Sequence, residues 1–398
     1  MADNLRSQFL LDPEVTFLNH GSFGACPRPV FEAYQAWQRK LEFQPVAFLD
    51  PLRGYGGWLR DARVAMAAEF GCAPDDIVGL VNTTEALNIV AQSLDLQPGD
   101  EILTTDHEYA ALDKTWAYVA RRTGAKVVAA PIPLPLTSAE AFTEAVRARI
   151  TPRTRVLFLS HITSATALVF PIETIIAEAR ARGIATVIDG AHTPGHIPLD
   201  LTALGADYYA GNCHKWLMAP KGSAFLYVRR DLQAGINPLV ISHGWTLQAD
   251  QPGSTGGFGN AAFVDMIEVQ GTRDPAALLT VPDAIAFRHQ HGWDQIAARC
   301  RDLAQETAAR VVTLTGVPPL SGPAFCAPQM VAMQVPACEP VALKLALLAD
   351  YGIEIPVYDW QDRTIVRLSV QGYNTVAEMD RLVGALDAIL PRLRKSVA

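Results

Sequence analysis

Two stretches of the chain, TVIDGAH at 186–192 and GNCHKW at 211–216, carry the pattern that indicates the fold. In the first, an apolar β-branched run ends in Asp189, as a buried strand would. In the second, Lys215 lies just past another predicted strand, Tyr208–Gly211. Because ligands of open α/β sheets bind at the carboxyl ends of the strands, Asp189 and Lys215 are expected to face one crevice.

Strand-like and helix-like segments alternate around these stretches, from about Leu59 to Leu390. Short β-branched runs between amphipathic segments such as Thr84–Leu94 and Ile172–Arg182 are typical of a parallel sheet with helices on both faces. The sequence therefore predicts an α/β fold. Its strands are expected at Ile77–Val81, Glu101–Thr105, Lys126–Ala130, Arg155–Ser160, Thr186–Asp189, Tyr208–Gly211 and Ala224–Val228.

The C-terminal part, after a long helix predicted at Ala276–Gln290, shows a different order of predicted helices and strands. Since 398 residues exceed one typical domain of about 100 to 200 residues, we predict an N-terminal arm at 1–20, a large domain at 21–285 and a small α+β domain at 286–398. The small domain is expected to hold helices Trp293–Leu314, Pro340–Tyr351 and Val376–Arg392 and strands Met330–Gln334 and Thr364–Ser369.

Composition narrows the class of protein. A net charge of -8 is opposite to the clustered positive charge that nucleic-acid binding requires. The six cysteines form no C-x-x-C pair, which disfavours a disulfide framework and a structural zinc site. No segment approaches the roughly 20 apolar residues of a membrane span, and the N-terminus lacks a basic, apolar leader. We expect a cytoplasmic protein without membrane or nucleic-acid partners.

Asp189 and Lys215 together indicate pyridoxal 5′-phosphate (PLP) chemistry. A lysine amine forms the Schiff base with this cofactor, and a carboxylate keeps its pyridine nitrogen protonated. Alone, Asp189 is equally typical of an acid that caps the next helix, and Lys215 is more typical of an exposed loop. Asn212, His214 and Trp216 crowd the same turn, however, which is an odd composition for a solvated loop.

A phosphate group also needs a binding site, and Asn82-Thr83-Thr84 supplies one between a predicted strand and a helix. Free backbone N–H groups and the positive end of the helix dipole favour an anion there, and the threonine hydroxyls can donate further hydrogen bonds. Without a cofactor, the same residues are a helix N-cap.

These motifs resemble fold-type I PLP enzymes of the class V aminotransferase family, which includes cysteine desulfurases and isopenicillin N epimerase. The resemblance covers nearly the whole chain. Phe17-Leu-Asn-His20-Gly-Ser-Phe-Gly24 and Thr105-Asp-His107-Glu-Tyr109 are most similar to the epimerase branch. The resemblance implies a homodimer with shared active sites and a small amino-acid-like substrate.

The resemblance also implies roles for individual residues. Lys215 would be the catalytic Schiff-base lysine, Asp189 the partner of the pyridine nitrogen, and His192 a neighbour of the phenolic oxygen. Ser164 stands in place of an asparagine of the desulfurases, and Tyr109 in place of their ring-stacking histidine. The phosphate would be held by Asn82, Thr83, Thr84, Asn212 and His214, and by Thr272 from the neighbouring subunit.

Substrate binding would fall to Arg367, in Ile365-Val-Arg367-Leu-Ser369, and to His20. The planar fork of an arginine pairs with a carboxylate through two hydrogen bonds. The alternative for Arg367 is a strand arginine at the sheet surface. Besides substrate binding, a second proton donor is needed for inversion, and Tyr109, His107 and His20 are the possibilities.

Epimerisation or racemisation is the reaction that the branch resemblance favours. A C–S lyase or other β-elimination, an aminotransferase and a PLP-binding protein without turnover remain alternatives. A desulfurase is disfavoured because Tyr351–Arg363, before Arg367, contains no cysteine. A zinc site at His192 and His196 is disfavoured by the proline and glycine between them, so no metal is expected.

Overall fold

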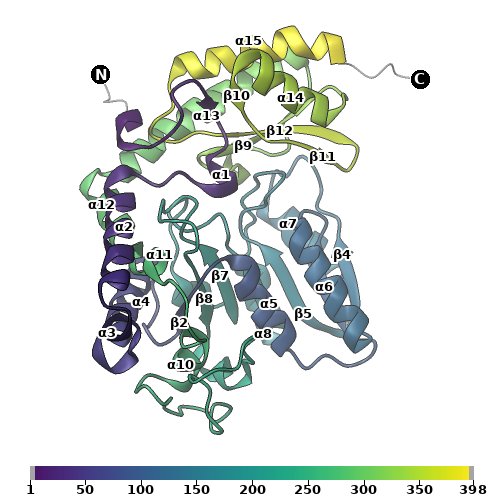
Figure 1. The fold of residues 1–398 in the computed structure, drawn as a ribbon. Coiled ribbons are helices and arrows are strands. Elements are labelled where there is room, and N and C mark those ends of the chain that lie inside the picture. The colour runs from purple at the N-terminus through teal and green to yellow at the C-terminus, as the bar shows by residue number, and fades with distance from the viewer. Residues whose placement is uncertain (1–4, 394–398) are drawn as a thin grey trace.

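The computed structural model describes residues 5–393, and residues 1–4 and 394–398 lie outside that description. A seven-stranded sheet, the large sheet, has the strand order β2-β8-β7-β6-β5-β3-β4 (Figure 1). All its pairs are parallel except those of β8, which is antiparallel to both neighbours. The strands are β2 (Ile77–Leu80), β3 (Glu101–Thr105), β4 (Lys126–Ala130), β5 (Thr154–Ser160), β6 (Ala185–Asp189), β7 (Tyr208–Asn212) and β8 (Ala224–Val228).

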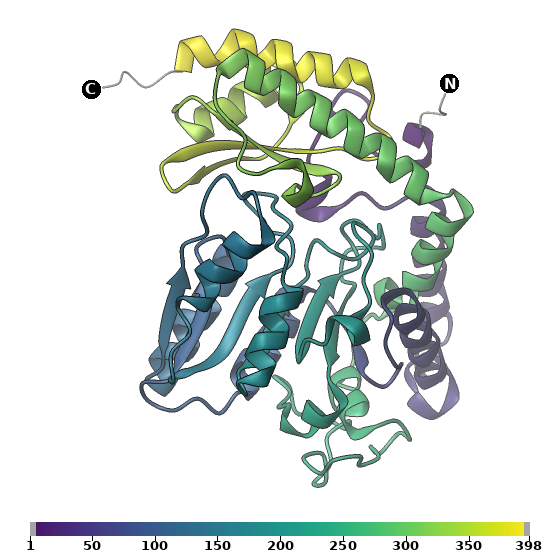
Figure 2. The same ribbon diagram turned by 180° about the vertical axis from the view of Figure 1, so that it is seen from behind.

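Helices cover both faces of the large sheet. Helices α5 (Thr83–Ser93) and α6 (Ala110–Thr123) lie on one face, and α7 (Ala139–Arg147) and α8 (Glu173–Ala181) on the other (Figures 1 and 2). Successive residues of a strand point to opposite faces. On β5, Val156 and Phe158 accordingly join the core beneath α5 and α6, and Leu157 and Leu159 the core beneath α7 and α8. The predicted α/β fold with a mainly parallel sheet is confirmed.

The C-terminal part forms a second layer, in which an antiparallel sheet, the small sheet, has the order β11-β12-β9. Helices α13, α14 and α15 cover its outer face (Figure 1). The elements are β9 (Met330–Val335), β11 (Val357–Trp360), β12 (Arg363–Ser369), α13 (Trp293–Thr315), α14 (Pro340–Tyr351) and α15 (Val376–Leu393).

The N-terminal segment crosses both layers. Strand β1 (Thr16–Phe17) pairs with β10 (Ile353–Glu354) of the C-terminal layer. The chain then passes through α1 (His20–Phe23) to helices beside the large sheet. The predicted boundaries after residues 20 and 285 remain predictions. The other segments are α2 (Arg28–Phe43), α3 (Pro45–Leu49), α4 (Gly56–Phe70), α9 (Leu201–Leu204), α10 (Ala262–Glu268), the 3₁₀ helices η1 (Leu5–Gln8), η3 (Arg230–Gly235) and η4 (Pro323–Phe325), and the π-helix η2 (Pro51–Tyr55).

One helix that was predicted to be continuous is interrupted in the structure. Ala276–Gln290 is two helices, α11 (Ala276–Leu279) and α12 (Val281–Gln290), with Thr280 between them. Pro282 explains the break, because a proline has no N–H to donate and its ring clashes with the carbonyl four residues earlier.

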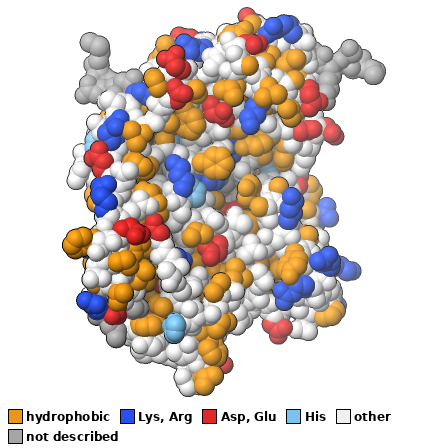
Figure 3. Space-filling view, in the orientation of Figure 1, with side chains coloured by type: hydrophobic (Ala, Val, Ile, Leu, Met, Phe, Trp, Pro, Cys, Tyr) orange, Lys and Arg blue, Asp and Glu red, His pale blue; other side chains and the backbone are white. Residues whose placement is uncertain are grey.

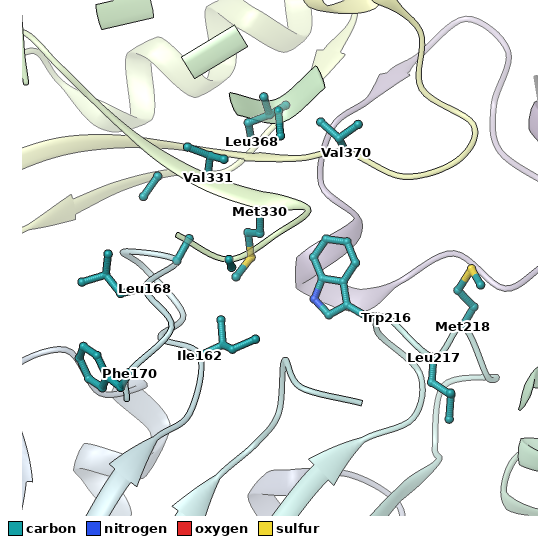
Figure 4. Close-up of a cluster of buried hydrophobic side chains, with 14 of the residues drawn as sticks. Ile162, Leu168, Phe170, Trp216, Leu217, Met218, Met330, Val331, Leu368 and Val370 are labelled. Carbon is teal, nitrogen blue, oxygen red and sulfur yellow. The ribbon is translucent and has the colours of Figure 1, made fainter. Parts of the chain in front are cut away.

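A hydrophobic cluster joins the two layers at the carboxyl end of the large sheet (Figure 4). It brings together side chains from the loops after β5 and β7 and from the small sheet. These include Ile162, Leu168, Phe170, Trp216, Leu217, Met218, Met330, Val331, Leu368 and Val370. The small sheet therefore covers the edge at which a ligand would bind. Across residues 5–393, no helix has both the length and the apolar character needed to cross a bilayer.

Candidate active site

A cavity of about 340 Å³ lies at the carboxyl edge of the large sheet. Seen from the side of Figure 1, basic and histidine side chains gather near a recess at the centre of the face (Figure 3). All but two of the predicted site residues line the cavity. Those that do are Asn82, Thr83, Thr84, Tyr109, Ser164, Asp189, His192, Asn212, His214, Lys215 and Arg367.

Strand ends place the polar residues. Asp189 is the last residue of β6 and Asn212 the last of β7. The turn after β6 requires Gly190, because a Cβ there would lie 2.1 Å from the ring of Tyr209. Its backbone lets Asp189 accept a hydrogen bond from the Ala191 N–H at 2.8 Å. Burial is the main reason why the pKa of Asp189 is raised.

Lys215 has a neutral partner in the cavity. Its Nζ lies 3.1 Å from Nε2 of His192. Burial lowers the pKa of Lys215 to about 7, with a further contribution from the charge of Arg367 and opposition from Asp189. A substantial share of this amine is therefore uncharged near neutral pH, which a nucleophile or general base requires.

The N-terminus of α5 presents polar groups to the cavity. Asn82 acts as the N-cap, accepting from the Glu85 N–H at 2.8 Å, and Asn212 Oδ1 accepts from the Thr83 N–H at 3.0 Å. The buried Thr83 Oγ1 has no hydrogen-bond partner in the described part of the chain. A buried hydroxyl without a partner is costly, so this helix end is suited to a ligand that accepts hydrogen bonds.

Arg367 is an almost fully buried cation, 1% exposed. Its guanidinium donates to Ser164 O at 2.6 Å and to Ser22 Oγ at 2.9 Å, and it lies 5.2 Å from the ring centre of Tyr358. Within residues 5–393 it forms no salt bridge, and its Nε has no hydrogen-bond partner. A buried guanidinium without a carboxylate is suited to bind an anion.

His20 and Thr272 do not line the cavity. His20 lies behind Lys215, fully buried, with Nδ1 2.9 Å from the Tyr373 hydroxyl and Nε2 3.1 Å from Lys215 O. Its predicted contact with substrate is therefore not favoured by the geometry. Thr272 lines a different cavity, beside Tyr55 and His243.

Among the lining residues that sequence reasoning missed are two with polar side chains, Tyr358 from the C-terminal layer and Ser22 from the N-terminal segment. Tyr358 lies on β11, in a hairpin whose turn residues Gln361 and Asp362 have φ values of 48° and 61°. Gln361 Nε2 anchors the hairpin on Asp106 Oδ2 at 3.0 Å. Ser22 lies in the motif around His20, and that motif was the only feature of the sequence that pointed to this part of the site. Nothing near Tyr358 in the sequence indicates that it lines the cavity.

Comparison with known proteins identifies the family. The family model described as aminotransferase class V matches residues 57–382. This chain is 38% identical to an isopenicillin N epimerase of Amycolatopsis lactamdurans, over 96% of this chain and 97% of that protein. The chain belongs to the class V aminotransferase family.

Two further relatives of this chain have other reactions in their names. It is 27% identical to an L-cysteine desulfhydrase of Arabidopsis thaliana, over 94% of this chain and 88% of that protein. A crystal structure of a cysteine desulfurase from Escherichia coli has a TM-score of 0.80 and 26% identity, over 98% of each chain.

Class V aminotransferases are PLP-dependent enzymes, so the predicted cofactor and enzyme class are confirmed. The residues present fit the cofactor. Lys215 offers an amine that is easily deprotonated, Asp189 a buried carboxyl, and Thr83 an unpartnered hydroxyl at a helix N-terminus. This donor set matches the aldehyde, the ring nitrogen and the phosphate of PLP.

The buried histidine directly after β5, His161, leads us to expect acid sensitivity. Burial lowers its pKa to about 4, so its contribution to stability is present above pH 6.5 and lost as pH falls towards 4. Between pH 7 and 4, the free energy of unfolding of the wild type should fall by about 3 kcal/mol more than that of His161→Phe. Denaturant titrations at the two pH values measure this. Equal pH dependence would contradict the prediction, and the exposed His291→Phe is the control.

Proposed function

We propose that this class V enzyme epimerises or racemises an amino acid, or an aminoacyl side chain, at its α-carbon. The observation that carries the proposal is a cavity lined by a readily deprotonated amine, Lys215, and by the buried guanidinium of Arg367, which has no carboxylate partner among residues 5–393. An amino acid has the matching groups, an α-proton and a carboxylate. The isopenicillin N epimerase at 38% identity supports inversion as the outcome.

Bound PLP makes the α-proton of an attached amino acid acidic. In this proposal Nζ of Lys215 would hold the cofactor before substrate binds and, once free as an amine, would take up that proton. Asp189 would pair with the ring nitrogen, and His192 and Ser164 would bind near the phenolic oxygen. Tyr109 would offer an aromatic face to the ring. The phosphate would be held by Asn82, Thr83, Thr84, Asn212 and His214.

Inversion needs a proton returned from the other side of the substrate. Of the three donors considered from sequence, only Tyr109 lines the cavity. His107 is 1% exposed, its Nδ1 lies 2.8 Å from Thr166 Oγ1, and it does not line the cavity. His20 is held by Tyr373. We therefore propose Tyr109 as the donor.

Shared active sites in a homodimer are part of the same proposal. Thr272 lines a cavity apart from the active site of its own chain. A contribution of this residue to PLP binding thus requires a second copy. Light scattering measures the oligomeric state, and the PLP content of Thr272→Ala measures the contribution of this residue to cofactor binding. If the protein is monomeric, Thr272 has no role in PLP binding.

A second candidate is β-elimination, which the name of the L-cysteine desulfhydrase favours. Incubation with a panel of amino acids in deuterated water separates the candidates. Inverted product carrying α-deuterium supports epimerisation. A keto acid with a released leaving group supports elimination, and a keto acid without one supports transamination. A panel without any exchange would contradict the proposed function.

Sulfur transfer through a protein persulfide should be absent. No cysteine of residues 5–393 lines the cavity, and Tyr351–Arg363, which includes β10 and β11, contains no thiol. Burial raises the pKa of Cys326 to about 11 and that of Cys300 to about 12. These two thiols are therefore disfavoured as thiolates, the form that attacks sulfur. Mass spectrometry during incubation with cysteine checks this, and a persulfide on any cysteine would overturn it.

A further inference from the structure

Trp216 is enclosed on every side although it follows the cofactor lysine directly. Its side chain is fully buried in the cluster between the layers (Figure 4). The ring stacks on His196, with centres 4.0 Å apart and planes 20° apart, and lies 5.0 Å from the ring centre of His20. Its carbonyl accepts from Arg288 Nη1 at 3.1 Å. The indole is therefore held in one position.

Neighbouring glycines leave room for this position. A Cβ on Gly21 would lie 3.3 Å from the indole Cζ2 and 2.8 Å from Met330 Sδ. A Cβ on Gly195 would lie 2.7 Å from the Trp216 carbonyl carbon, and Gly195 has φ of +76°. Both glycines occur in the motifs that surround His20 and His192.

The indole N–H determines the proton position on His192. Trp216 Nε1 donates to His192 Nδ1 at 3.3 Å. An indole nitrogen only donates, so Nδ1 must carry the lone pair, and a neutral imidazole then carries its hydrogen on Nε2. Burial keeps the ring neutral by lowering the pKa of His192 well below its usual value. Nε2 is the atom 3.1 Å from Lys215 Nζ.

We propose that Trp216 is a positioning residue that fixes the tautomer of His192, so that His192 presents an N–H donor to the Lys215 amine. An N–H donor hydrogen-bonds the neutral amine and opposes the ammonium form. The tautomer of His192 follows from hydrogen bonds within this chain. Only the role of the Lys215 amine as a base rests on the proposed function.

The charged groups around His192 and Lys215 favour the neutral forms of both side chains, except for Asp189. His192 faces Lys215, Arg367, His196 and His214, all of which disfavour its protonation. Lys215 faces Arg367, which disfavours the ammonium, and Asp189, which favours it. Without the indole N–H, the other tautomer of His192 would offer a lone pair to the ammonium. Loss of the N–H should therefore raise the pKa of Lys215.

The variant that tests this is Trp216→Phe, which removes the N–H and keeps an aromatic ring. Its matched control is Trp116→Phe, because Trp116 is equally buried and its Nε1 has no hydrogen-bond partner in residues 5–393. Nitrogen-15 NMR of histidine-labelled protein reports the tautomer, with the His192 signals assigned from their absence in His192→Gln. We expect an Nε2–H tautomer in wild type and control, and loss of that preference in Trp216→Phe.

A second measurement concerns Lys215 itself in protein freed of PLP by hydroxylamine. The pH dependence of its acylation, followed by peptide mass mapping, should show an acid dissociation constant about tenfold lower in Trp216→Phe than in the control. If Trp216→Phe does not fold, site-specific benzothienylalanine at position 216 keeps the shape and removes the N–H. An unchanged tautomer, or Nδ1–H in the wild type, overturns the proposal. Neither readout requires turnover, so failure here is distinct from failure of the proposed reaction.

Discussion

Lys215→Ala is expected to purify without covalently attached PLP and to turn over at least about 10²-fold more slowly than wild type, the lower end of the contribution of a general base. The reason is that Lys215 is the one lysine among the residues lining the cavity. Borohydride reduction followed by peptide mapping measures the attachment, and the deuterium exchange of the best substrate measures the turnover.

Lys221→Ala is the matched control, because Lys221 lies in the same loop but does not line the cavity. It should keep both the attached cofactor and the exchange activity. If Lys215→Ala keeps a borohydride-reducible link to PLP, the assignment of the cofactor lysine is wrong.

Arg367→Ala is expected to lower kcat/KM by roughly 10- to 150-fold, since hydrogen bonds to a charged group contribute about 1.5 to 3 kcal/mol. The substitution removes the buried guanidinium and leaves Ser164 O and Ser22 Oγ without their donor. Arg367→Lys should recover only part of the loss, because a lysine lacks the planar fork that pairs with a carboxylate. The absorbance of bound PLP should persist in both variants.

Arg363→Ala supplies the control on the same strand. Arg363 begins β12, lies near the ring of Trp360 at 5.7 Å and does not line the cavity. Its removal should leave kcat/KM within about twofold of wild type, as is usual for surface substitutions. Unchanged kinetics in Arg367→Ala would return that arginine to a structural role in the small sheet.

Local sequence patterns were enough to predict the large sheet and one side of the site. Apolar runs such as Thr186–Asp189 can be read as strands because each residue is buried on one face or the other. Their polar ends then fall at one edge by topology alone. This is why Asp189, Asn212 and Lys215 were predicted to meet, and the structure places all three at the cavity.

Residues whose surroundings are distant in sequence were less predictable. His20 shares a motif with Ser22, yet Ser22 lines the cavity and His20 packs against Trp216. Tyr358 reaches the site only because β11 folds back along β12. Neither outcome has a local signal, because each depends on how the two layers pack.

The sequence by itself determined the α/β fold, the PLP chemistry and the residues at the sheet edge, since strand ends and helix starts follow from short-range patterns. The tertiary structure alone decided which groups are isolated from counter-charges and water. Burial between the layers lowers the pKa of Lys215, leaves Arg367 without a carboxylate in the described chain, and aligns Trp216 with His192. Those properties arise from desolvation and from the packing of the two layers, such as the contacts of Arg367 with Ser164 and Ser22, which are 203 and 345 residues away in the chain, and no local pattern encodes them.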